Sequence, residues 1–300
     1  MTMNNRLKGS VALIAAAFVW GMAFSAQSNA MRYIQPFTFV FLRSAITCAV
    51  LLLATPLFRR VGAHRAADAA PPLRAHIVPG MLCGVFLVSA TILQQVGLVY
   101  TTPAKSGFVT ALYIVIVPIM GLFLGRRVRP AVWLGLALSL TGMVLLCVGD
   151  DLSINAGDLF TLGSAFMFSC QIIMVGRSAP NLDAMLLSAM QFATCAVVAG
   201  VAAFAFETPR VEGMLACWTS ILYVAVFSGA VGYTLQMVGQ KYADPTLASL
   251  LMCLESVFAA LGGWLLLGQT LLTRELLGCG LMLAASIVAQ LPDRSAHHRA

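Results

Sequence analysis

Two ionisable side chains, Glu255 and Arg43, lie well inside long apolar stretches of the chain. A charged side chain at the centre of a membrane helix costs roughly 2.5–3.5 kcal/mol on insertion scales, so its presence calls for a function or a partner. We predict that Glu255 is a proton-coupling site or the counter-charge of a ligand amine. The alternative is a neutral or paired carboxyl that holds neighbouring helices together. Arg43 lies nearer the end of its stretch, where its guanidinium could snorkel to the surface or meet a helix terminus, and we expect a structural role.

Uncharged amides recur in the apolar stretches. The segment LQQVGLVYTTP, Leu93–Pro103, places Gln94 and Gln95 side by side, and LQMVGQKYADP, Leu235–Pro245, repeats six of its residues 142 positions later. Such amides can hydrogen-bond a polar solute without fixing its charge. The alternative is interhelical hydrogen bonding, worth about 0.6–2 kcal/mol per bond in membranes. Gln27, Gln94 and Gln95 are candidates for solute binding with the alternative left open, whereas Gln236 is assigned to interhelical bonding.

An aromatic and amide stripe follows one face of a predicted helix. Trp20, Phe24 and Gln27 fall at positions i, i+4 and i+7, and Phe168 and Gln171 repeat the end of this stripe 144 residues later. We predict that Trp20, Phe24, Gln27 and Gln171 line a binding site. The alternative for the aromatic residues is packing or interface anchoring, which is the commoner role of such rings in membranes.

Lys105 and Tyr113 share a predicted ridge with Val109 at four-residue spacing. Lys105 could attract a ligand carboxylate at the outer mouth of a site, or it could be an ordinary interfacial lysine. Tyr113 lies 142 residues before Glu255, so the repeat places a phenol and a carboxyl at equivalent positions. Both Lys105 and Tyr113 are therefore candidate binding residues.

The elements that must position these residues are membrane helices. The chain is 60% apolar and 10% charged, too apolar for one soluble core of 300 residues. A transmembrane helix needs about 20 mostly apolar residues, and ten such runs follow one another. They cover 11–30, 34–58, 77–99, 104–124, 130–148, 158–176, 184–206, 215–239, 245–267 and 274–291. The sequence predicts an all-α polytopic membrane protein with ten transmembrane helices, since barrel strands would be shorter and alternating.

The positive charge is distributed as a topology signal. With both termini in the cytoplasm, 13 of the 18 lysines and arginines lie in inner segments, so the net charge of +7 follows the positive-inside rule. No nucleic-acid footprint is needed to explain it. We predict a multi-pass protein of the plasma (inner) membrane, with the lipid bilayer and a small-molecule solute as its partners and no nucleic acid.

The chain contains an internal duplication. FSAQ at Phe24–Gln27 returns as FSCQ at Phe168–Gln171, and TCAV at Thr47–Val50 returns at Thr194–Val197, in the same order as the glutamine segments. We predict two five-helix repeats, over 11–148 and 157–291. Because five is odd, the second repeat must enter the membrane from the opposite side. Inverted repeats of this kind are typical of alternating-access transporters.

The sequence resembles the ten-helix drug/metabolite transporter superfamily, EamA type. The resemblance rests on AAAFVWGMAFSAQ in span one, FLRSA in span two, LQQVGLVYTTPAKSGFVTALYIVIVPIMGLFLG across spans three and four, and LESVFAALGGWLLLGQ in span nine. It implies a secondary transporter or exporter of small metabolites or amino acids, with a cavity lined mainly by spans one, three, four, six, eight and nine. Many members have proline directly after the span-nine glutamate. Here Ser256 follows Glu255, which leaves Pro118 of span four as the one predicted bend.

The competing class is an intramembrane enzyme that acts on a lipid or prenyl substrate. A hydrolase would need a base beside its nucleophile, yet all four histidines fall in predicted cytoplasmic segments or at a span edge. Asp150, Asp151 and Asp158 are expected to be solvated turn acids. The eight scattered cysteines form no CxxC pair, so we expect neither a metal nor another cofactor. A channel would need a selectivity filter, and nothing in the sequence resembles one. Because both halves are fused in one chain, we expect a monomer.

Overall fold

The computed structural model describes residues 3–61, 71–101, 103–126, 128–147, 155–267 and 272–290, which form helices and connecting turns with no strand among them. The first half of the chain contains α1 (Met3–Ala30), α2 (Pro36–Val61), α3 (Leu73–Tyr100), α4 (Pro103–Ala111), α5 (Tyr113–Phe123) and α6 (Pro130–Cys147). The second half contains α7 (Ala156–Ser178), η2 (Ala179–Asn181), α8 (Ala184–Phe206), α9 (Val211–Ala216), α10 (Trp218–Tyr223), η3 (Val224–Gly232), α11 (Tyr233–Gln240), α12 (Pro245–Met252), α13 (Glu255–Leu267) and α14 (Thr273–Gln290).

Each of the ten predicted runs is occupied by helix, and the ends of two runs, Val148 and Leu291, lie outside the described residues. Within the described ranges, eight helical segments are long and apolar enough to cross a membrane, and Pro130–Leu146 is a shorter apolar helix. These helices confirm the prediction of an all-α polytopic membrane protein. The count of ten spans and the inversion of the second repeat stay predictions.

The outer surface of the bundle is apolar. Large hydrophobic side chains stand exposed on most of the helices, among them Leu53, Phe123, Val201 and Phe206, and Phe123 is 88 % exposed. Helices that are apolar on their outer faces as well as on their inner faces are typical of a bilayer environment, because lipid tails cover the outer side chains. The same composition that excludes a soluble core thus produces a bundle that presents hydrocarbon to its surroundings.

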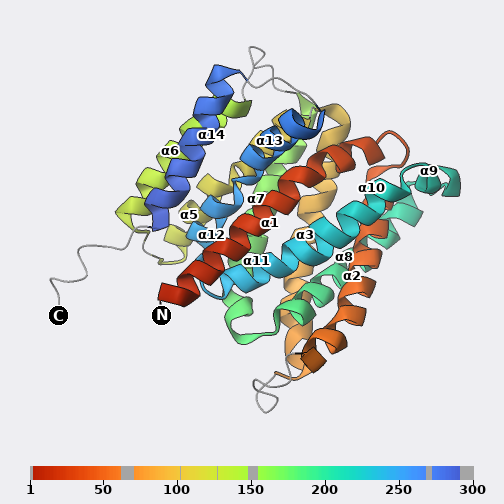
Figure 1. The fold of residues 1–300 in the computed structure, drawn as a ribbon. Helices are drawn as coiled ribbons and strands as arrows, with labels where there is room; N and C mark the ends of the chain where they lie inside the picture. Colours follow the sequence, from red (N-terminus) through yellow and green to blue (C-terminus); the bar gives the residue numbers. More distant parts are fainter. Residues whose placement is uncertain are drawn as a thin grey trace.

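The helices of the first half pack against those of the second. α2 packs along α8, α3 along α7 and α8, and α6 along α14, while α1 contacts α11 and α13. Figure 1 shows α6 and α14 side by side at one edge of the molecule, and α2 beside α8 at the other. Gly142 and Gly278 allow the close crossing of α6 and α14, since a Cβ built on either would lie within 2.6 Å of the other's carbonyl oxygen. The two halves therefore share one interface along the bundle.

Spans four and nine are both interrupted, at matching places. Between α4 and α5, Leu112 has φ −60° and ψ −12°, and after α12 Cys253 has φ −64° and ψ −12°. These dihedrals lie near those of a 3₁₀ turn, which tightens the chain and restarts the helix at Tyr113 and at Glu255. The sequence predicted a bend in span four alone, from Pro118. Pro118 lies inside α5, so a bend at that residue stays a prediction, and the turns that interrupt both spans contain no proline.

Candidate functional site

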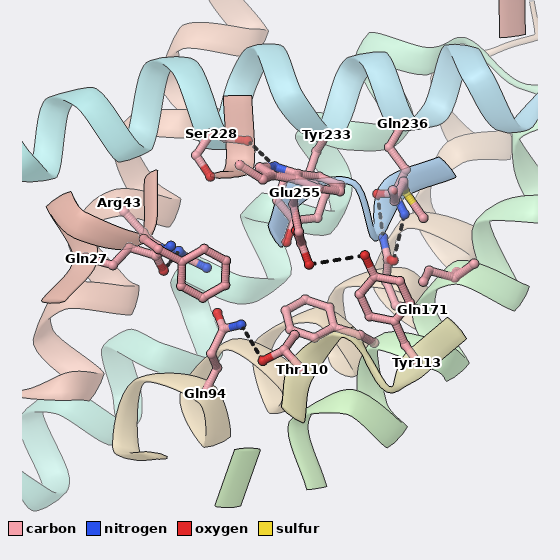
Figure 2. A pocket seen from close by; sticks show the side chains of 15 residues that line it. Gln27, Arg43, Gln94, Thr110, Tyr113, Gln171, Ser228, Tyr233, Gln236 and Glu255 are labelled. Atoms are coloured by element: carbon pink, nitrogen blue, oxygen red, sulfur yellow. Dashed lines mark hydrogen bonds between the residues drawn. The ribbon is translucent and has the colours of Figure 1, made fainter. Parts of the chain in front are cut away.

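One pocket gathers polar and aromatic side chains from both halves of the bundle (Figure 2). Each of the six spans expected from the family resemblance contributes to it, and α2 contributes as well. Its lining residues are Trp20, Phe24, Gln27, Arg43, Gln94, Thr110, Tyr113, Phe168, Gln171, Ile172, Ser228, Tyr233, Gln236, Met252 and Glu255. An apolar and aromatic wall with a few converging polar groups is the usual composition of a small-molecule site.

Glu255 and Tyr113 meet in this pocket. The Tyr113 hydroxyl donates a hydrogen bond to Glu255 Oε1 over 3.1 Å, and the Glu255 side chain is 5 % exposed. Among the described residues this is the one hydrogen bond of the carboxyl, so Oε2 stays available to a ligand or a proton. Glu255 is also the first residue of α13, where the positive end of the helix dipole favours a negative charge.

The contact joins two residues that occupy equivalent positions of the predicted repeats. Tyr113 is the first residue of α5 and Glu255 is the first residue of α13, 142 positions later. Equivalent residues of two related halves can touch one another only close to the axis that relates them. The pair is thus placed where a two-fold relation between the halves would put a shared site.

In the first half, Gln27 is the centre of a buried amide network. Gln27 Oε1 accepts hydrogen bonds from Gln95 Nε2 at 2.6 Å and from Arg43 Nη1 at 3.2 Å. Gln94 points differently: its Nε2 donates to the Thr110 hydroxyl over 3.1 Å. Adjacent residues on a helix point about 100° apart, so only one of the two neighbouring glutamines can face the pocket. That residue is Gln94, whereas Gln95 is fully buried and joins α3 to α1.

A matching network lies in the second half. Gln171 and Gln236 exchange hydrogen bonds of 3.3 Å and 3.1 Å, and Gln171 Nε2 also donates to Gln191 Oε1 over 3.2 Å. Figure 2 shows the Gln171 and Gln236 amides together at one side of the pocket. The interhelical bonding predicted for Gln236 is therefore present, although the residue lines the pocket too. In each half, hydrogen bonds thus join a glutamine of the first span to one of the third span and to a polar residue of the second.

The structure brings seven of the nine predicted site residues into the pocket. Gln95 lies behind the lining, and Lys105 is absent from it. The Lys105 ammonium instead forms an ion pair with Asp158 Oδ2 at 2.7 Å, which joins α4 to α7. Asp158 is 6 % exposed and also accepts from the Thr101 hydroxyl over 3.0 Å. The expectation that Asp158 is a solvated turn acid was wrong, because it packs into the contact between helices; Asp150 and Asp151 lie outside the described residues.

We expect Asp158→Ala to destabilise the protein. The Asp158 carboxylate accepts from the backbone N–H of Asn155 at 2.9 Å, and Asn155 Oδ1 accepts from the N–H of Asp158 at 3.0 Å, so the two form a capping box on α7. Loss of a cap costs about 0.5–2 kcal/mol, and the partly exposed ion pair adds to this. The apparent melting temperature of detergent-purified protein should fall, less for Asp158→Asn, and stay unchanged for the exposed control Glu212→Ala. Equal effects of the Ala changes at Asp158 and Glu212 would contradict the expectation.

Arg43 lines the pocket, although the sequence interpretation did not include it among the candidate binding residues. It was expected to have a structural role and either to snorkel or to meet a helix terminus; its side chain is 5 % exposed and lines the pocket beside Gln27. The signal was present in the sequence, since the cost of burying a charge applies to Arg43 as it does to Glu255. Tyr233 was missed as well. Its ring lies 4.9 Å from that of Trp20, whose indole Nε1 donates to the Ser228 carbonyl over 3.1 Å.

Comparisons with known proteins agree over nearly the whole chain. An uncharacterized transporter of Archaeoglobus fulgidus is 27% identical over 293 residues, which cover 95% of this chain and 87% of the relative. The uncharacterized inner membrane transporter YedA of Escherichia coli strain K12 is 26% identical over 292 residues, covering 93% and 90%. A solved crystal structure of a protein superposes with a TM-score of 0.76 at 19% identity, covering 96% of this chain and 98% of that one, and this likeness shows the fold alone.

The sequence pattern of the EamA-like transporter family matches the chain twice, at residues 7–148 and 155–290. Together these matches span most of the 300 residues. Both relatives are named as uncharacterized transporters, and the apolar helices of this chain are long enough to cross a membrane. The protein belongs to the EamA-like transporter family.

Proposed function

We propose that the protein is a secondary transporter that exports a small metabolite or amino acid by alternating access and couples this movement to protons at Glu255. One observation carries the proposal. The Tyr113–Glu255 contact joins the first residues of α5 and α13, which restart an interrupted span in each half, inside a pocket lined by both halves. Interrupted helices that meet at a repeat interface are a recurrent way to build a transport site.

The inverted arrangement of the halves is part of this proposal, with repeats over 11–148 and 157–291. It is supported by the pairing of equivalent helices: α2 and α8 fall in spans two and seven, and α6 and α14 fall in spans five and ten. Two related halves that pack through equivalent helices have two related ways of rocking against each other. Because both halves of one chain contribute to the pocket, we propose that the protein is a monomer. We also propose that it lies in the inner membrane with both termini in the cytoplasm.

Among the residues that line the pocket, Glu255 is the one with a carboxyl group. The titratable groups around it are the Tyr113 and Tyr233 hydroxyls and the Cys253 thiol, and Arg43 lies in the same pocket. A proton and a ligand ammonium would compete for the same carboxylate. Competition of this kind exchanges one for the other across the membrane, which is the simplest coupling for an exporter.

The enzyme alternative draws no support from the described residues. His76 is buried, its Nδ1 lies 3.1 Å from the Pro72 carbonyl oxygen, and its Nε2 accepts from the Asp183 N–H over 2.9 Å. Both ring nitrogens are thus used by the backbone, which leaves no free nitrogen to act as a base. The relatives are named as transporters, which also favours transport of a solute over an enzymatic reaction.

Transport can be tested with the purified protein in liposomes. A mixed pool of amino acids and metabolites is supplied outside, and mass spectrometry follows what enters under an interior-acid gradient, under the opposite gradient and without a gradient. We expect accumulation of a few solutes under the interior-acid gradient, as proton antiport requires, and loss of accumulation when an ionophore collapses it. Entry that ignores the gradient would overturn the coupling. No entry beyond that into protein-free liposomes would overturn the transport proposal.

A further inference from the structure

Arg43 brings a permanent positive charge into the pocket. Arginine stays charged inside proteins, and in the described part of the chain no carboxylate forms an ion pair with Arg43. Its contacts are the neutral Gln27 amide and the face of the Phe39 ring, 5.7 Å from the guanidinium carbon to the ring centroid. Arg43 Nε is buried and has no hydrogen-bond partner among the described residues. A buried, incompletely bonded guanidinium is costly unless a ligand completes it.

Glu255 occupies a different part of the same pocket. In Figure 2 Arg43 lies with Gln27 on one side, whereas Glu255 points toward Tyr113, away from the guanidinium. The two charged groups come from α2 and α13, and they form no ion pair with each other. Each therefore faces the pocket with bonding capacity to spare.

The remaining wall of the pocket is apolar and aromatic. Trp20, Phe24, Phe168 and Tyr233 contribute rings, and the Trp20 and Tyr233 rings pack against each other. Such a wall suits an apolar or aromatic body that carries polar groups at one end. A ligand with both an anionic and a cationic group could satisfy Arg43 and Glu255 at once.

We propose that the pocket selects zwitterions, with Arg43 binding a ligand carboxylate and Glu255 binding the ligand ammonium, while the aromatic wall holds an apolar side chain. The inference rests on the proposed transport function and narrows its substrate class. The planar guanidinium of an arginine can bind a carboxylate through two parallel hydrogen bonds, a bidentate geometry that a lysine cannot provide. A ligand that lacks either charge would leave one buried protein charge unpaired.

Matched probes test this inference by calorimetric binding to the purified full-length protein. L-phenylalanine carries both charges, 2-phenylethylamine lacks the carboxylate, and 3-phenylpropanoate lacks the ammonium; L-leucine, 3-methylbutylamine and 4-methylpentanoate form a second set. We expect the zwitterion of at least one set to bind roughly 10- to 100-fold more tightly than its two analogues, as loss of a hydrogen bond to a charged group implies. Arg43→Gln should weaken zwitterion binding and leave amine binding unchanged, so the preference over the amine disappears.

The control removes the same charge outside the pocket. Arg32 is exposed, and Arg32→Gln should keep the wild-type preference. Equal binding of a zwitterion and its amine to the wild-type protein would overturn the inference, and this comparison needs no variant to fold. A uniform loss for all probes in Arg43→Gln would also overturn it, because that result indicates a structural arginine. If the solute pool is transported but neither zwitterion binds, the zwitterion inference fails while the transport proposal stands.

Discussion

Glu255→Gln is expected to reduce gradient-driven accumulation to the level of protein-free liposomes while the protein stays folded. Glutamine has nearly the same shape, and its Oε1 can still accept the hydrogen bond that Tyr113 donates over 3.1 Å. It cannot bind and release a proton, and it brings no negative charge to the pocket. Since burial of a charge without an ion-pair partner is costly, its removal should not impair folding, and the loss should be one of coupling.

Two assays separate the possible roles of Glu255. Accumulation under an interior-acid gradient measures coupling, whereas counterflow without a gradient measures binding and movement of the solute alone. A carboxylate that only carries the proton would leave counterflow intact in Glu255→Gln; one that also holds the ligand ammonium would lose both, and we expect the second result. Glu212→Gln changes an exposed acid outside the pocket and is the control. Wild-type accumulation in Glu255→Gln would reduce Glu255 to a structural carboxyl.

The duplicated sequence made much of the candidate site predictable. Because related halves keep equivalent positions, the 142-residue offset drew attention to Tyr113 and Glu255 before any contact between them was visible. The same offset drew attention to the glutamines, and the structure places Gln94 and Gln236 in one pocket. The helical class followed from apolar runs alone, since hydrocarbon leaves few alternatives to the backbone.

The structure differs from the sequence interpretation where the direction of a side chain depends on which face of a helix is turned inward. Lys105, Val109 and Tyr113 form one ridge only if span four is a continuous helix. The turn at Leu112 ends α4 and restarts the helix as α5. Thr110 of α4 and Tyr113 of α5 both line the pocket, while Lys105 of α4 pairs with Asp158. Such a turn contains no proline or glycine that sequence patterns could have flagged. Packing, and not local propensity, places it.

Gly21→Ala is expected to damage both stability and transport, because α1 crosses α13 with the backbones in contact at this point. A Cβ on Gly21 would lie 2.5 Å from the Glu255 carbonyl oxygen and 2.8 Å from the Ala259 nitrogen. Backbone atoms cannot rotate aside as a side chain can, so the helices must separate. Overpacking of this kind costs about 1–3 kcal/mol. The separation would also shift the first residue of α13, whose carboxylate contacts Tyr113.

Alanine at two other glycines should destabilise the protein less than alanine at Gly21. A Cβ on Gly262, which lies in α13, would meet the sulfur of Met22 at 2.5 Å. Because this flexible side chain can move, Gly262→Ala should destabilise the protein less than Gly21→Ala. Gly280 in α14 has open space, and Gly280→Ala should be neutral or stabilise its helix by up to about 1 kcal/mol. Apparent melting temperature and gradient-driven uptake should both fall in the order Gly280, Gly262, Gly21. Equal behaviour of all three variants would mean that α1 does not cross α13 at the transport site, and the link between that crossing and the position of Glu255 would have to be abandoned.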